Sequence, residues 1–151
     1  MNAFTRWALA AVAAAGLAID AYVHLHIAHR YLPITTGTVN EGVLFRIEGA
    51  LAVAAALWVL VRPAWLSAAF ALLVAAGGAT AVLVYGLVDV GKIGPLPNMY
   101  DPVRYWTWDQ KFSLAGELAA TLAALALLAG TVLGSRVKPS AMGMRATPGR
   151  L

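Results

Sequence analysis

Four long apolar stretches dominate the chain, and short polar segments separate them. They cover about residues 7–28, 43–61, 64–88 and 113–133. A helix that crosses a bilayer needs roughly 20 mostly apolar residues, so each stretch is long enough. Only Arg62 and Pro63 separate the second stretch from the third, which predicts a tight helical hairpin with Pro63 in the first turn of the third helix. The pattern therefore predicts an all-α membrane protein, a four-transmembrane-helix bundle over residues 1–137 with a flexible basic tail over 138–151.

The composition excludes the main alternatives to a membrane protein. Of the 151 residues, 61% are hydrophobic and 12% are charged, whereas soluble domains are roughly 45–50% apolar and 25% charged. A disordered chain is also excluded, because such chains are poor in apolar residues. The chain has no cysteine, which excludes thiolate metal sites and iron–sulfur clusters. The net charge of +4 does not indicate nucleic-acid binding, because membrane topology explains the placement of the basic residues better.

The distribution of charge predicts the orientation of the bundle. Both ends of the chain and the turn at 62–63 share one side, which carries six basic residues and no acid: Arg6, Arg62, Arg136, Lys138, Arg145 and Arg150. The other side and the adjoining ends of the helices carry five basic residues and all seven acids. By the positive-inside rule, both termini are expected in the cytoplasm.

Ionisable residues within the apolar stretches fall in the predicted outer half of the bundle. Because such residues are costly in a bilayer, they are candidates for function. Asp20 and His24 are four residues apart and so share one face of the first helix. Glu48 and Glu117 lie at a similar depth on the second and fourth helices, with Arg46 near Glu48. If these helices turn their polar residues inward, the bundle carries an outward-opening polar pocket.

Three interpretations of this cluster are open. The first is an ion-pair network in which Arg46 satisfies Glu48 or Glu117 and Asp20 orients His24, since buried charges are normally paired. The second is a pocket for a quinone or another small molecule, where His24 and a carboxylate would move protons. The third is a metal site, with Asp20, His24, Glu48 and Glu117 as nitrogen and oxygen ligands.

The long loop between the third and fourth stretches is rich in proline and aromatic residues. Its prolines stiffen the backbone and set turns. A structured loop of this length is typical of a lid or a docking surface. The candidates for docking are Met99, Tyr100, Trp106 and Trp108. The alternative is that the aromatic rings anchor the helices at the level of the lipid headgroups.

Several short motifs give the chain a family resemblance. The loop contains Gly-Pro-Leu-Pro-Asn-Met-Tyr at 94–100, Glu48-Gly49 lies early in the second stretch, Arg62 follows that stretch, and 113–130 is rich in alanine and leucine. With its four-span layout, the chain resembles uncharacterised small bacterial integral membrane proteins and, more distantly, the DoxX-like family. The resemblance implies a bacterial cell inner (plasma) membrane and a small subunit beside a partner in quinone-linked redox chemistry. It assigns no catalytic residue.

The leading expectation is an accessory subunit of a membrane complex, with a polar pocket at the outer end of the bundle. The alternative is a stand-alone membrane enzyme or binding protein that uses the Asp/His/Glu cluster for a metal, a quinone or a lipid-like ligand. The expected partners are the lipid bilayer and either a membrane protein complex or further copies of the chain. A transporter is less favoured, because the predicted inner halves of the helices lack polar residues for a path.

Overall fold

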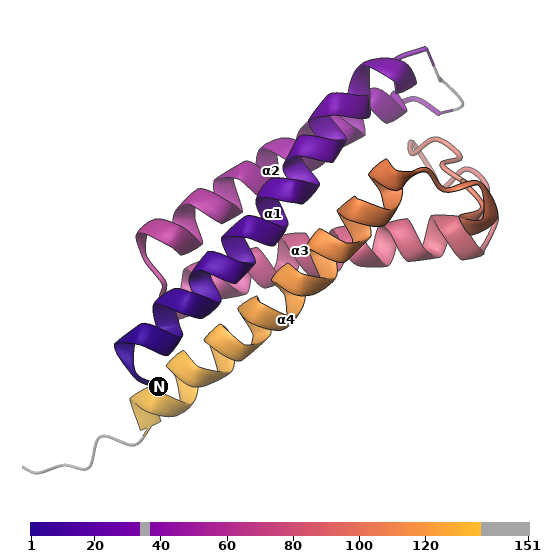
Figure 1. Cartoon of the computed structure of the whole chain (residues 1–151). Coiled ribbons are helices and arrows are strands. Elements are labelled where there is room, and N and C mark those ends of the chain that lie inside the picture. Colours follow the sequence, from indigo (N-terminus) through magenta and orange to yellow (C-terminus); the bar gives the residue numbers. More distant parts are fainter. Residues whose placement is uncertain (34–36, 137–151) are drawn as a thin grey trace, which may run out of the picture.

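The fold consists of four long helices, shown in Figure 1. The computed structural model describes residues 1–33 and 37–136, the last three by backbone only, so the predicted tail over 138–151 lies outside the described residues. The elements are α1 (Ala3–Tyr31), α2 (Glu41–Val61), α3 (Trp65–Leu87), the short 3₁₀ helix η1 (Val103–Tyr105) and α4 (Trp108–Arg136). The four α-helices are long and apolar enough to span a membrane. No strand occurs within the described ranges.

Three of the helices begin before the apolar stretches that predict them. The side chain of Asn2 accepts a hydrogen bond from the backbone N–H of Thr5 at 2.7 Å, so α1 begins at Ala3. Asn40 caps α2 in the same way, through the N–H of Val43 at 3.2 Å. The polar turn that opens α4 is helical as well, although hydropathy does not mark it. Capping oxygens satisfy amide groups that have no partner within the helix, which explains where α1 and α2 begin.

The turn between α2 and α3 differs from the prediction in one respect. Pro63 lies before the helix, because α3 begins at Trp65. Buried Ser67 organises the turn instead: its hydroxyl accepts from the N–H of Ala64 at 3.1 Å and donates to the carbonyl of Arg62 at 2.5 Å. The hairpin keeps α2 and α3 together here, and the two helices diverge toward their other ends (Figure 1).

Helix α1 makes the most extensive contacts, with α2 and α4, while α3 packs mainly against α4 and less against α2. Gly16 on α1 lies against Gly116 on α4, and a Cβ on either residue would collide with the carbonyl oxygen of the other. Small residues of this kind allow membrane helices to approach closely. The α1–α4 crossing is therefore backbone against backbone.

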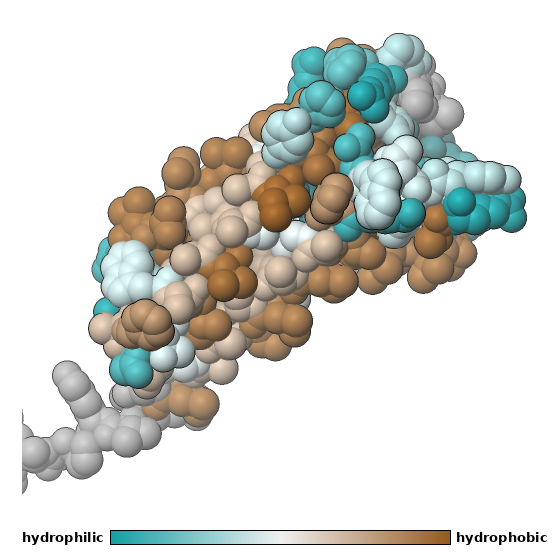
Figure 2. Space-filling model, viewed as in Figure 1, coloured by the Kyte–Doolittle hydropathy of each residue, from teal (hydrophilic) through white to brown (hydrophobic). Residues whose placement is uncertain are grey.

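The apolar core lies in one half of the bundle. We call the half that carries the α2–α3 hairpin the turn end, and the half that carries the α1–α2 and α3–α4 loops the loop end. The core at the turn end is built mostly from alanine, with a few larger residues that are fully buried: Leu17, Val59 and Leu127. Figure 2 shows an apolar surface along the body and hydrophilic side chains gathered at the loop end. The polar residues of interest also lie toward the loop end.

Candidate functional site

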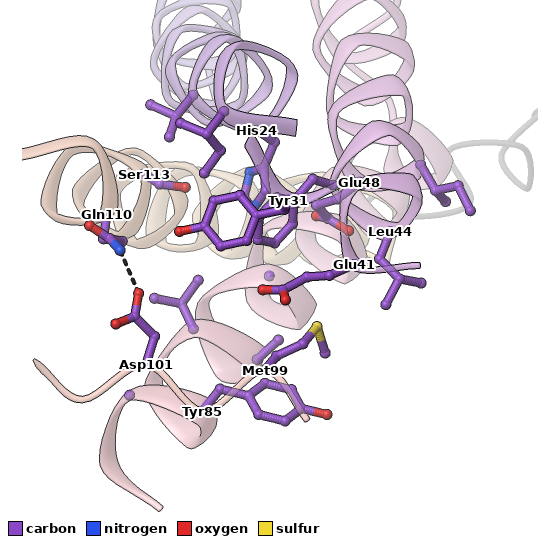
Figure 3. Close-up of a pocket in the computed structure, with 18 of the residues that line it drawn as sticks. His24, Tyr31, Glu41, Leu44, Glu48, Tyr85, Met99, Asp101, Gln110 and Ser113 are labelled. Atoms are coloured by element: carbon purple, nitrogen blue, oxygen red, sulfur yellow. Dashed lines mark hydrogen bonds between the residues drawn. The ribbon is translucent and has the colours of Figure 1, made fainter. Parts of the chain in front are cut away.

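A pocket of about 440 Å³ lies between the helices toward the loop end. All four helices and the α3–α4 loop contribute to it, and it forms where α2 and α3 diverge. Its lining is mainly apolar, with a smaller set of polar side chains, most of them labelled in Figure 3: His24, Tyr31, Glu41, Glu48, Tyr85, Asp101, Gln110 and Ser113. An apolar cavity with a few polar groups is typical of a small-molecule site.

Asp20 lies at the centre of a buried polar cluster beside this pocket. Its Oδ1 is 2.7 Å from Nδ1 of His24, one helical turn away, and accepts a hydrogen bond from the hydroxyl of Ser113 on α4 at 2.8 Å. Asp20 is 0% exposed and His24 is 7% exposed. The predicted pairing of Asp20 with His24 is therefore present, and Ser113 connects it to α4.

Glu117 completes the cluster from α4. One ligand atom from each of Asp20, His24 and Glu117 lies within 4.8 Å of the others, and all three residues are buried. Both carboxylate oxygens of Glu117 are buried and make no hydrogen bond, and the same holds for Oδ2 of Asp20. The cluster thus presents several buried acceptor oxygens that the surrounding protein does not satisfy.

Glu48 approaches Glu117 at Gly78 of α3. A Cβ on Gly78 would collide with Oε1 of Glu117 and would lie 3.1 Å from Oε1 of Glu48, so the absent side chain leaves space for both carboxylates. The Oε1 atom of Glu48 is also buried without a hydrogen-bond partner. The structure therefore brings all three predicted carboxylates and His24 into one region, with Glu48 outside the closest group.

Arg46 does not join this region, which corrects the first interpretation. Its side chain is exposed, and among the described side chains the ion pairs are His24–Asp20 and Arg30–Asp109. The reason is helical geometry: two residues turn a helix by about 200°, so Arg46 and Glu48 point to different sides of α2. The predicted network of arginine and glutamate is wrong for Arg46.

The four docking candidates in the long loop divide into two pairs. Met99 and Trp106 line the pocket, whereas Tyr100 and Trp108 are exposed, at 39% and 70%. Trp108 lies against Phe112, with the ammonium of Lys111 5.0 Å from its ring centroid. The loop therefore presents Met99 and Trp106 toward the cavity and Tyr100 outward, and α4 begins with the exposed Trp108.

Hydrogen bonds hold the loop over the pocket. The indole of Trp106 donates to the carbonyl of Asp101 at 2.8 Å, and the Asp101 N–H donates to the carbonyl of Tyr85 on α3 at 3.0 Å. Gln110 of α4 donates to the Asp101 carboxylate at 2.6 Å, the interaction drawn in Figure 3. These contacts connect the loop to the ends of α3 and α4 and so fix the roof of the cavity.

Several residues of the site are absent from the sequence-based prediction. Ser113 is four residues before Glu117, and Tyr31 is seven after His24, so helical spacing could have placed both on the polar faces. Glu41 opens α2 and resembles an ordinary N-terminal acid, yet it is only 6% exposed. Gly78 carries no polar signal at all, and its role depends on the carboxylates that approach it.

Comparison of the chain with protein-family models, curated proteins and solved structures finds no match. The geometry of the site is therefore the basis for the functional argument.

Proposed function

We propose that this chain is a multi-pass membrane protein that binds a lipid-soluble molecule with a polar head group, and that a quinone is the first candidate. The observation that carries the proposal is the 440 Å³ pocket with an apolar lining and buried polar groups at one side. This corresponds to the binding-protein alternative from the sequence. The proposal assigns a ligand site and makes no statement about a reaction.

The lining matches the two parts of such a ligand. Hydroxyl, amide and imidazole groups from Tyr31, Gln110 and His24 are available to carbonyl or hydroxyl oxygens of a head group. Ile47 lines the pocket and is 51% exposed, so the cavity reaches the surface of the bundle beside α2. An apolar tail can leave through this opening toward lipid, while the head group stays among the polar side chains.

Filling the pocket tests the proposal directly. Val82 lines the cavity from α3, and Leu83, the next residue, is exposed and does not line it. We expect Val82→Trp to weaken binding of a short-chain quinone by at least about tenfold, equivalent to 1.4 kcal/mol. Leu83→Trp is the matched control and should bind as the wild type does. The measurement is a ligand titration of the full chain in detergent micelles, followed by tryptophan fluorescence.

A parallel titration with phosphatidylglycerol distinguishes the two sources of an amphipathic ligand. Saturable binding of the quinone alone supports the proposed head group, and saturable binding of the phospholipid alone replaces the quinone with a lipid. Equal binding to both tryptophan variants would refute the pocket as the site.

A second candidate function is the accessory subunit of a membrane complex. The observation that favours it is the exposed aromatic surface at the loop end, where Tyr105 and Trp108 are 66% and 70% exposed. Affinity isolation from native membranes in mild detergent tests this role, with Trp108→Ala as the variant. Recovery of free monomer alone would count against it, and a partner lost in the variant would support it.

We also propose that both termini face the cytoplasm in a bacterial inner membrane. The support is the excess of basic residues without acids at the turn end, which includes Arg6 and Arg62. Reporter fusions to the C-terminus test the orientation: a fluorescent cytoplasmic reporter should be active there, and a reporter that requires export should be inactive.

A further inference from the structure

We propose that Asp20, His24 and Glu117 bind a divalent transition-metal ion, such as Zn²⁺ or Mn²⁺, at the polar side of the pocket. This inference goes beyond the proposed function, because an apolar cavity can bind an amphipathic ligand without a metal. Three residues from α1 and α4 place one potential ligand atom each within 4.8 Å of the others. Imidazole nitrogen and carboxylate oxygen are ligands that these ions accept.

The unsatisfied oxygens supply independent support for a ligand. Oδ1 of Asp20 is engaged by His24 and Ser113, which leaves Oδ2 without a partner. Both oxygens of Glu117 are also without a hydrogen bond, and both residues are 0% exposed. Buried polar atoms in proteins are nearly always hydrogen-bonded, so three neighbouring orphan oxygens indicate a group that belongs between them.

The charge of the cluster specifies a cation. Glu48 adds a third carboxylate near Glu117, again with a buried, unpartnered oxygen. Arg46 is exposed, and among the described side chains no lysine or arginine pairs with any of these carboxylates. Buried carboxyl groups are normally paired with a counter-charge, bound to a metal or neutralised by a proton. A divalent ion supplies the positive charge that no described lysine or arginine supplies to these carboxylates.

Shared protons are the competing explanation, since neighbouring carboxyl groups can hold one between them. A protonated carboxyl group normally donates a hydrogen bond to a nearby acceptor. The carboxylate of Asp20 lies close enough to Glu117 to be such an acceptor. Titration with metal ions distinguishes a bound ion from a shared proton.

The surroundings match those of a metal site with an open position. Ser113 holds Asp20 in place, as hydrogen bonds around ligating carboxylates commonly do. Gly78 leaves the space that Glu117 and Glu48 occupy. His24, Glu48 and Ser113 line the pocket, so an ion can enter from it and remain accessible to a bound molecule. Three protein ligands beside an open cavity are typical of metal sites that also bind an exogenous ligand.

The test is metal binding to the full chain in detergent. The protein is stripped with a chelator, passed through a desalting column, and titrated separately with Zn²⁺ and Mn²⁺ by calorimetry, with elemental analysis of the reloaded protein. We expect about one ion per chain for at least one metal, as the three-ligand set implies. Ser113→Ala should weaken binding by about 10–100-fold, the usual effect of losing a residue that orients a ligand.

The ligand variants and their control make the result decisive. Glu117→Gln and Asp20→Asn should lower the affinity more than Ser113→Ala does. Glu41→Gln removes another buried carboxyl group of the pocket, outside the three-residue group, and should bind metal as the wild type does. Circular dichroism and gel filtration confirm that each variant is folded.

Two outcomes would overturn the inference: the absence of stoichiometric binding of either ion to the wild type, or binding that survives Glu117→Gln. The first outcome would favour shared protons. Val82→Trp separates this inference from the proposed function, because it should block the amphipathic ligand and leave metal binding intact. In the wild type, binding of the quinone without metal, or of metal without the quinone, identifies which proposal fails.

Discussion

The helices pack closely at the turn end of the bundle and diverge around a cavity at the loop end. At the turn end, an alanine-rich core brings the helices into close contact, and midway along the bundle α1 meets α4 backbone to backbone through Gly16 and Gly116. Toward the loop end, α2 and α3 diverge around a cavity, and Glu117 is buried with both carboxylate oxygens unsatisfied. Lipid offers little hydrophobic force between helices, so packing holds the turn end together. That packing supports a loop end whose polar groups are costly to bury.

The largest expected effect comes from one glycine substitution at the close α1–α4 contact and one beside the cavity. Gly16→Ala places a Cβ against the carbonyl oxygen of Gly116, and we expect the free energy of unfolding to fall by about 2–3 kcal/mol through overpacking. Gly77→Ala meets no atom within 4 Å and removes the flexibility of glycine from α3, so it should stabilise by about 0.5–1 kcal/mol. Denaturation in mixed micelles measures both. Changes of the same sign would contradict the comparison.

A second pair of variants tests whether the polar cluster reduces stability. With a chelator present, Glu117→Met should raise the free energy of unfolding by about 1–4 kcal/mol, because an apolar side chain replaces buried unsatisfied oxygens. Leu127→Met, in the fully buried core of the turn end, should instead cost up to about 1.5 kcal/mol. The same denaturation assay applies. A loss of stability in Glu117→Met without metal would show that the carboxylate has a partner within the protein.

The smallest effect concerns the roof of the cavity. Trp106→Phe removes the indole donor to the Asp101 carbonyl and should cost about 0.5–1.5 kcal/mol. It should also increase cleavage of the α3–α4 loop in limited proteolysis. Trp108→Phe alters a ring that is 70% exposed and should leave both measurements near wild type. Equal protease sensitivity of the two variants would indicate that the indole bond does not hold the loop.

Spacing along a helix correctly predicts the pairing of Asp20 with His24, and it explains why the prediction for Arg46 is wrong. Asp20 and His24 are one turn apart, and the structure pairs them. The expected role of Arg46 ignored the same rule, because a residue two positions from Glu48 cannot share its face. Hydropathy also does not predict the polar first turn of α4, since it does not distinguish a polar helical turn from a loop.

The spacing of residues along one helix does not predict which residues of two different helices come into contact. Ser113 reaches Asp20 across 93 positions of sequence, and Gly78 makes room for Glu117 from another helix. The outward or inward direction of Met99 and Trp106 also depends on how the loop returns over α3. Each of these features requires the rotation and crossing of two helices, which no single segment encodes in its own pattern.

Hydropathy alone was sufficient for the four helices, because the length of an apolar run must match the thickness of a bilayer. It also located the ionisable residues, since these are rare in such runs. The faces that meet, the divergence of α2 from α3, and the gathering of Asp20, His24 and Glu117 came from the fold. They depend on close contacts such as Gly16 with Gly116, where the absence of a side chain sets how near two helices can lie.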